Sequence, residues 1–142
     1  MPSDEVIKKY NATPCKSVEE VLEKADFVSI HCPGGESTYH LMNKERIGLM
    51  KKGAYLINSA RGDVIDNDAL IDALKNNKIA GAGLDVFEGE PKLNPGFLEC
   101  ENAVLLPHLG SASIETRIAM GMRVLENMAA YYSDKEPRDR VV

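Results

Sequence analysis

The chain has 142 residues, of which 44% are hydrophobic and 27% charged, and it carries a net charge of −5. That length suits one domain with its own apolar core, and the acidic balance argues against a surface for nucleic acid or anionic membrane. No apolar run approaches the roughly 20 residues that span a bilayer, and the start, Met1–Glu5, lacks the basic and then apolar pattern of a secretory signal.

Neither a disulfide framework nor a metal site is indicated. Cys15, Cys32 and Cys100 are odd in number and lack C-x-x-C spacing. His31 and His40 have no partners at metal-ligand spacing, so we interpret both as structural. We therefore expect no bound metal and a reducing, cytoplasmic location.

The first part of the chain alternates helix and strand signals. Asp4–Tyr10 is expected to form a short helix and Ala12–Cys15 a short strand. Ser17 and Glu20 have the spacing of a capping box, which predicts the start of a helix. Phe27–His31 is an almost continuous apolar run, which is typical of a strand covered on both faces.

The middle of the chain repeats this alternation. A loop, Cys32–Gly35, leads to a helix that Asn43 caps, and Ala54–Asn58 is the next buried strand. Asp66 then opens a helix that ends at Asn76.

Two strands and a long helix follow. Ile79–Leu84 is a strand with two glycines, which indicate a close approach of its backbone to a neighbour. Asn94–Cys100 is a loop or single turn, and Ala103–Leu106 is the last strand. A long helix begins near Ser111 or Ser113, with one apolar stripe along it. Strands that alternate with helices predict a parallel sheet wrapped in helices.

Three short strings follow strand-like runs, at the places where a parallel sheet presents its ligands. They are Asn58–Gly62, Gly83–Pro91 and Pro107–Gly110. In the first string, Arg61 could hold a carboxylate through two parallel hydrogen bonds. The alternative is a surface arginine that pairs with Asp63 or Asp66.

The third string contains a candidate acid/base, His108, because imidazole exchanges protons near neutral pH. A nearby carboxylate would favour its protonated form, and both Glu88 and Glu90 are candidates between which spacing does not choose. Asp85 could accept a hydrogen bond from a ligand, or could act as a turn or cap residue. Cys32 is expected to line a pocket and not to act as a nucleophile.

These strings resemble the carboxy-terminal part of the D-isomer-specific 2-hydroxyacid dehydrogenases. The matching segments, within about residues 15–135, are HCPGGESTYHLMN, MKKGAYLINSARGDVIDNDAL, IAGAGLDVFEGEP and LLPHLGSAS. The resemblance implies an α/β fold, namely a three-layer, parallel-sheet, Rossmann-like partial nucleotide-binding domain. Residues 1–142 would form this single partial NAD(P)-binding domain.

The resemblance also implies roles for individual residues. Arg61 would bind the substrate carboxylate and carbonyl, His108 would be the acid/base, and Glu90, not Glu88, would tune the histidine. The contacts to the nicotinamide half of NAD or NADP would fall on Cys32, Pro33, Thr38, Ser59, Ala60, Arg61, Asp85, His108 and Gly110.

The implied reaction transfers hydride from NAD(P)H to the carbon of a 2-oxo acid while His108 protonates the oxygen. The loop HCPGG and the ending PRDRVV look most like glyoxylate/hydroxypyruvate reductases. Two alternatives are a non-catalytic interaction module and half of a split enzyme that needs an amino-terminal partner.

The sequence contains no G-x-G-x-x-G loop. We therefore expect a chain that begins late in the family's cofactor domain, lacks the substrate domain, binds NAD(H) weakly and is inactive alone. The absent strands would leave an unpaired apolar edge at Phe27–His31. Re-pairing with Ala12–Cys15, dimerisation or strand exchange would cover it, and we predict a homodimer or higher oligomer.

Overall fold

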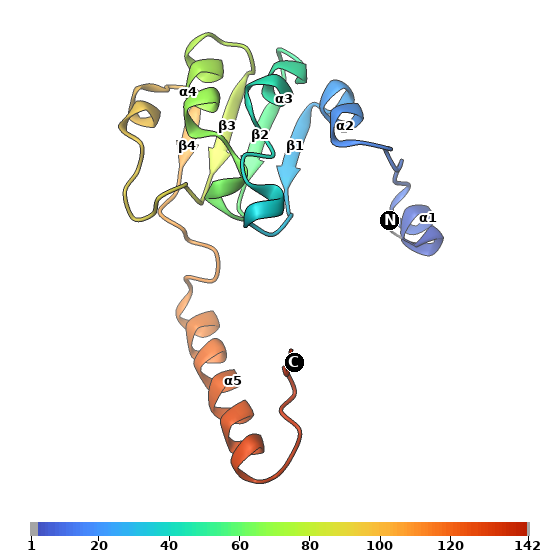
Figure 1. The fold of residues 1–142 in the computed structure, drawn as a ribbon, viewed down its shortest axis with the longest axis vertical. Coiled ribbons are helices and arrows are strands. Elements are labelled where there is room, and N and C mark those ends of the chain that lie inside the picture. Colours follow the sequence, from blue (N-terminus) through green and yellow to red (C-terminus); the bar gives the residue numbers. More distant parts are fainter. Residues whose placement is uncertain (1–2, 142) are drawn as a thin grey trace. The chain divides into compact units, whose positions relative to one another are not determined.

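The computed structural model describes residues 3–141. Residues up to Pro107 form one compact unit, and residues from His108 form a second. The first unit contains a four-stranded, all-parallel sheet in the order β1-β2-β3-β4 (Figure 1). Its strands are β1 (Phe27–Ile30), β2 (Tyr55–Asn58), β3 (Gly81–Leu84) and β4 (Ala103–Leu105). The predicted α/β class with a parallel sheet is confirmed.

Four α-helices accompany these strands, and three short 3-10 turns lie between them. The helices are α1 (Asp4–Tyr10), α2 (Val18–Lys24), α3 (Lys44–Leu49) and α4 (Asn67–Lys75). The turns are η1 (Glu36–Thr38), η2 (Gly62–Val64) and η3 (Pro95–Glu99). The predicted order of elements is therefore largely confirmed, with boundaries shifted by one or two residues.

The helix starts follow from local capping, as the sequence predicts. Ser17 Oγ accepts the Glu20 amide at 3.2 Å, Asn43 caps α3 and Asp66 caps α4. The return bond of the capping box differs, because Glu20 Oε2 accepts the amide of Lys16 at 2.7 Å. Each cap satisfies a backbone donor that the first turn of a helix leaves without an intrahelical partner.

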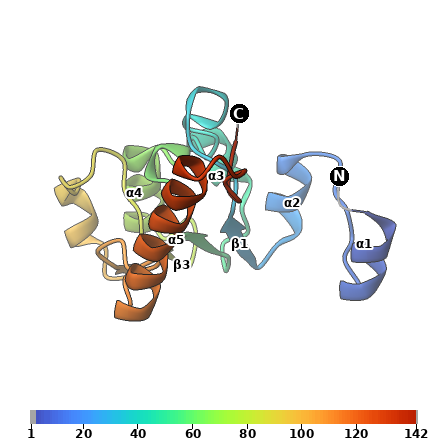
Figure 2. The same cartoon turned by 90° about the horizontal axis from the view of Figure 1, so that it is seen from below.

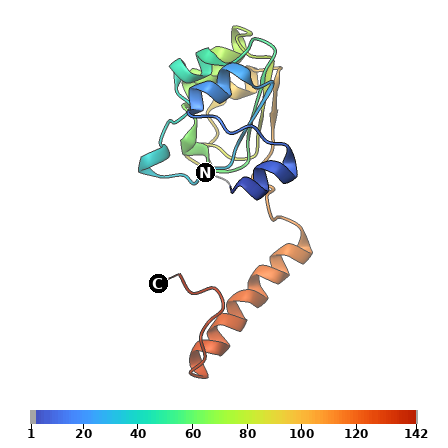
Figure 3. The ribbon, with the colours of Figure 1, turned by 90° about the vertical axis from the view of Figure 1, so that its right-hand side faces the viewer.

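The apolar core lies on one face of the sheet. Leu22 of α2, Ile47 of α3 and Leu70 of α4 are at most 1% exposed, and they belong to one cluster with Val28 and Leu56 of the strands. Figure 3 shows α2, α3 and α4 on one side of the strands. Burial of this layer supplies most of the hydrophobic stabilisation of the unit.

The other face of the sheet is open in residues 3–107. Phe27 is 70% exposed, Tyr55 42% and Val104 65%, and the Phe27 and Tyr55 rings stack with centroids 5.3 Å apart. The expectation that Phe27–His31 is covered on both faces is therefore wrong. Side chains of β1 alternate between exposed and buried, because successive residues of a strand point to opposite faces and the helices cover only one of them.

The predicted short strand Ala12–Cys15 is also wrong. Asn11 ends α1 in the left-handed conformation at φ 49°, and the Ala12 amide donates back to Ile7 O at 2.9 Å. Pro14 lacks a backbone donor, and β1 pairs with β2 alone among the described strands. The segment therefore does not re-pair with β1, which remains an edge strand.

The prediction for the two glycines of β3 is confirmed at Gly81. A Cβ built there would lie 2.6 Å from Asn102 O and 3.1 Å from the Tyr55 ring. Only a residue without a side chain leaves room for the neighbouring strands at that distance.

The second unit consists mainly of α5 (Ile114–Tyr132), one continuous helix (Figure 2). Ser113, not Ser111, is its N-cap, and its Oγ accepts the Thr116 amide at 3.2 Å. None of its residues is buried. Within residues 3–141, no helix combines the length and the apolar character that crossing a membrane requires.

The assigned core predicts that two leucine-to-alanine substitutions differ in their effect on the free energy of unfolding. Leu70→Ala, at a position 0% exposed, should lower the free energy of unfolding by about 2–5 kcal/mol, because it removes buried methyl groups and leaves a cavity. Leu98→Ala, at 73% exposure, should change it by less than about 0.5 kcal/mol. Urea unfolding followed by circular dichroism measures both, and equal losses would contradict the assigned core.

Candidate active site

A buried asparagine shapes the turn that carries Arg61. Asn58, at the end of β2, is 1% exposed; its Nδ2 donates to Arg61 O at 2.9 Å, and its Oδ1 accepts the Ala60 amide at 3.0 Å. The buried side-chain amide keeps its hydrogen-bond partners only if the turn has this backbone conformation. Ser59, Ala60 and Arg61 are therefore held at the carboxyl end of β2.

Arg61 itself is exposed, and its Nη1 donates to Ala60 O at 2.6 Å. The alternative pairing with Asp63 or Asp66 is not formed within residues 3–141. Asp63 Oδ2 accepts the Gly35 amide at 2.8 Å, and Asp66 Oδ1 accepts the Ala69 amide at 3.0 Å. The exposed guanidinium thus follows the end of β2 and, among the described residues, has no ion pair with either carboxylate.

The loop after β1 lies against this turn. Gly35 reaches Asp63 as described, and a Cβ added to Gly34 would lie 2.9 Å from Arg61 Cβ. Within the loop, Thr38 Oγ1 donates to Pro33 O at 2.6 Å. The loop that carries Cys32, Pro33 and Thr38 is therefore packed beside Arg61.

The loop after β3 meets the same turn through backbone. A Cβ on Gly62 would overlap the backbone of Phe87 and Glu88, so only glycine allows the two loops to touch here. Asp85 follows β3, is 9% exposed, and its amide donates to Asn58 O at 2.9 Å. The loops that follow β1, β2 and β3 thereby meet at one edge of the first unit.

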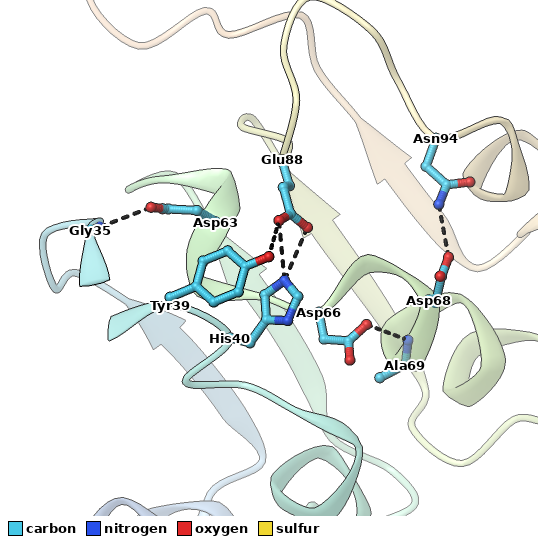
Figure 4. A network of polar contacts seen from close by, with 9 residues as sticks. All are labelled: Gly35, Tyr39, His40, Asp63, Asp66, Asp68, Ala69, Glu88 and Asn94. Carbon is cyan, nitrogen blue, oxygen red and sulfur yellow. Dashed lines mark hydrogen bonds and ion pairs between the residues drawn. The ribbon is translucent and has the colours of Figure 1, made fainter. Parts of the chain in front are cut away.

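The two candidate carboxylates take different partners. Glu90 Oε1 accepts the Phe87 amide at 2.7 Å, which closes the turn that follows β3. Glu88 Oε1 accepts the Tyr39 hydroxyl at 2.9 Å, and its Oε2 lies 3.1 Å from His40 Nε2. Figure 4 shows this contact beside the Gly35–Asp63 bond.

The Glu88 carboxylate raises the pKa of Tyr39, chiefly through the hydrogen bond that it accepts from the hydroxyl. Partial burial and the negative charge of Glu88 act in the same direction. Tyr39 therefore stays protonated and remains a donor at neutral pH.

His108 and Gly110 belong to the second unit. His108 has φ 55° and Ser111 φ 62°, so the backbone turns sharply on both sides of Gly110. Such values are uncommon outside glycine. Arg61, Asp85 and Glu90 thus belong to the first unit, and His108 to the second.

Four residues of this edge were not singled out in the sequence as site residues: Asn58, Gly62, Asp63 and His40. Asn58 has a sequence signal, because it is a polar residue at the end of an apolar strand run. Gly62, Asp63 and His40 act through contacts to distant segments, which local spacing does not encode.

The fold and this edge define a class of protein, namely a parallel α/β unit whose strand-end loops present an arginine and carboxylates. Residues 1–110 match the family described as "D-isomer specific 2-hydroxyacid dehydrogenase, NAD binding domain". The chain belongs to this family.

The chain matches part of the length of two longer relatives. It is 48% identical over 134 residues to the glyoxylate reductase of Pyrococcus horikoshii, a match that covers 94% of the chain and 40% of the relative. It is 51% identical over 104 residues to the peroxisomal glycerate dehydrogenase of Arabidopsis thaliana, which covers 73% and 27%. The chain thus spans about two fifths or less of these relatives.

A solved structure carries the same fold. An NADPH-dependent glyoxylate/hydroxypyruvate reductase from Sinorhizobium meliloti, in complex with NADP and malonate, superposes with a TM-score of 0.80 at 34% identity. The match covers 91% of this chain and 45% of that one.

The close contact at Gly62 predicts a second contrast. Gly62→Ala should destabilise the unit by roughly 3 kcal/mol, because the loops after β2 and β3 must separate. Gly48→Ala, in α3 with open space around it, should be neutral or stabilising by about 0.5–1 kcal/mol. Thermal unfolding compares them; a Gly62 variant as stable as the Gly48 variant would exclude the tight contact.

Proposed function

We propose that the chain supplies the substrate-orienting and nicotinamide-facing part of an NAD(P)-dependent reductase of small 2-oxo acids, of the glyoxylate/hydroxypyruvate type. The observation that carries this is the gathering of Arg61, Asp85 and Glu90 at the carboxyl edge of a parallel sheet, in a chain of this family. The named activities of the similar proteins agree with it.

The residues of this edge fit the nicotinamide half of the cofactor. Asp85 offers a largely buried carboxylate at the end of β3, which suits a ligand amide or hydroxyl. Cys32, Pro33, Thr38, Ser59, Ala60 and Gly110 are the further contacts that we propose. NAD(P)H supplies the hydride when bound.

In this proposal the protein's own groups orient the substrate and move a proton. Arg61 holds the carboxylate of the 2-oxo acid through two parallel bonds and polarises its carbonyl. His108 gives a proton to the carbonyl oxygen, and Glu90 favours the imidazolium form that donates it. Glu88 is less suited to this role, since Tyr39 and His40 occupy its oxygens.

The reaction also requires polypeptide that the 142 residues do not contain. A G-x-G-x-x-G loop before a helix cradles the pyrophosphate in dinucleotide-binding folds, and the sequence has none. We therefore propose that the chain alone is inactive and binds NAD(H) weakly, and that an amino-terminal half completes the site. A single partial domain and a cytoplasmic location remain predictions.

An absorbance assay tests this function. With NADH and glyoxylate or hydroxypyruvate, the chain alone should be inactive, and a mixture with the amino-terminal part of a similar glyoxylate reductase should oxidise NADH. Arg61→Gln should lower kcat/KM in the mixture by about 100-fold or more, since the substrate loses its paired hydrogen bonds.

The matched control is Arg138→Gln, at an exposed position in the tail, which should keep the activity of the unaltered chain. A mixture whose parts associate but which reduces neither acid would refute the proposed function. Activity of the chain without a partner would refute only the need for one.

The bare face and edge of the sheet motivate a proposal about assembly. β1 is an edge strand. Phe27 on β1, Tyr55 on the neighbouring β2 and Val104 on β4 expose apolar surface. Edges and faces of this kind are usually covered. We propose that a second copy of the chain covers them, as a homodimer.

Light scattering at micromolar concentration should give a mass near twice 15.6 kDa. Phe27→Glu should shift the mass towards the monomer, because it places a charge on the covered face, whereas Leu98→Glu, at similar exposure on η3, should not. A monomeric unaltered chain would contradict the homodimer, and a complex that forms only with the amino-terminal half would favour the split enzyme.

A further inference from the structure

Three titratable side chains form a compact cluster beside the proposed site. The rings of Tyr39 and His40 stack with centroids 3.9 Å apart and planes 15° from parallel. Both direct a polar atom at the Glu88 carboxylate, at 2.9 Å from the hydroxyl and 3.1–3.2 Å from the imidazole (Figure 4). One carboxylate is therefore held by two donors from adjacent residues.

The cluster joins segments that are far apart in the chain. Glu88 lies 49 residues after Tyr39 and 48 after His40. A contact over this separation imposes a loop-closure cost, which the surrounding structure must offset. The cluster thus ties the loop after β1 directly to the loop after β3.

The backbone of His40 is fixed as well. Its φ of 48° lies in the left-handed region, where few residues other than glycine settle without support. Its amide donates to Asp63 O at 2.8 Å, and the next ladder bond runs from the Met42 amide to Val64 O at 2.9 Å. An imposed conformation of this kind aims the imidazole at Glu88 and points to a role for the contact.

Glu88 lies within the turn from Phe87 to Glu90, whose two ends are joined by a hydrogen bond. The Glu90 carboxylate accepts the Phe87 amide at 2.7 Å, which joins the two ends of the segment from Phe87 to Glu90. A restraint on Glu88 is consequently a restraint on the Glu90 carboxylate.

We propose that Tyr39, His40 and Glu88 form a positioning clamp that fixes the direction of the Glu90 carboxylate. The role of the clamp in proton transfer rests on the proposed function, in which Glu90 supports His108. The clamp itself, as a restraint on the Phe87–Glu90 turn, exists independently of that reaction. These three are positioning residues, because they act through Glu90.

Glu88→Gln and Glu88→Ala separate the clamp from simple charge effects. Glutamine keeps a carbonyl oxygen that accepts from the Tyr39 hydroxyl or from a protonated His40 Nε2, whereas alanine removes both acceptors. Tyr39→Phe removes one donor and keeps the ring, and His40→Gln removes the stacked imidazole. His31→Gln is the matched control, since His31 contacts Ser29 Oγ at 2.8 Å and not the loop after β3.

The readout is the Phe87 amide in the full ¹⁵N-labelled chain. Its exchange with solvent reports how firmly the turn holds the hydrogen bond to the Glu90 carboxylate. In Glu88→Ala and Tyr39→Phe the amide should exchange about tenfold faster. Glu88→Gln and His31→Gln should retain the exchange rate of the unaltered chain.

A Phe87 amide that exchanges at its normal rate in Glu88→Ala would overturn the clamp. So would an equal loss in His31→Gln, because the effect would then reflect general destabilisation, which urea unfolding of each variant measures in parallel. Neither readout uses NADH or a 2-oxo acid. A failure of the clamp and a failure of the proposed reductase are therefore distinguishable.

Discussion

The candidate site depends on one backbone contact, between Gly62 in the turn after β2 and the Phe87–Glu88 peptide after β3. The parallel register pairs Asn58 with Leu84, so the two strands end at the same level. The loops that follow them therefore start side by side. A side chain at position 62 would force them apart. The absence of one lets the turn that carries Arg61 and the turn that carries Glu90 become neighbours.

Around this contact, most carboxylates of the edge already accept hydrogen bonds from the protein itself. Asp66 caps α4, Asp63 holds the Gly35 amide and Glu88 holds two aromatic donors. Because these charges are engaged elsewhere, they do not neutralise the Arg61 guanidinium, which donates to Ala60 O. An arginine without a carboxylate partner in the described unit suits the anionic end of a small acid. The edge is thus arranged by hydrogen bonds between loops before any ligand binds.

The two faces of the sheet in this unit differ in how much of their surface is buried. Helices bury one face of it, while the stacked rings of Phe27 and Tyr55 remain on the other. In α/β proteins parallel sheets are normally covered on both faces. The relatives matched here are more than twice as long as this chain. The unit therefore combines a site edge held by hydrogen bonds with a sheet face that residues 3–107 leave bare.

Much of the fold follows from the sequence alone, because its causes are local. The caps at Ser17, Asn43 and Asp66 act between residues three positions apart, and apolar runs between them place the strands. The segments that resemble the family predict Arg61, Glu90 and His108 as catalytic residues. Tertiary structure decided the rest: which face of β1 is bare depends on where the helices pack, and the partner of Glu88 lies 48 residues away in His40. Such contacts are set by how distant segments meet in the folded chain, which no local pattern records.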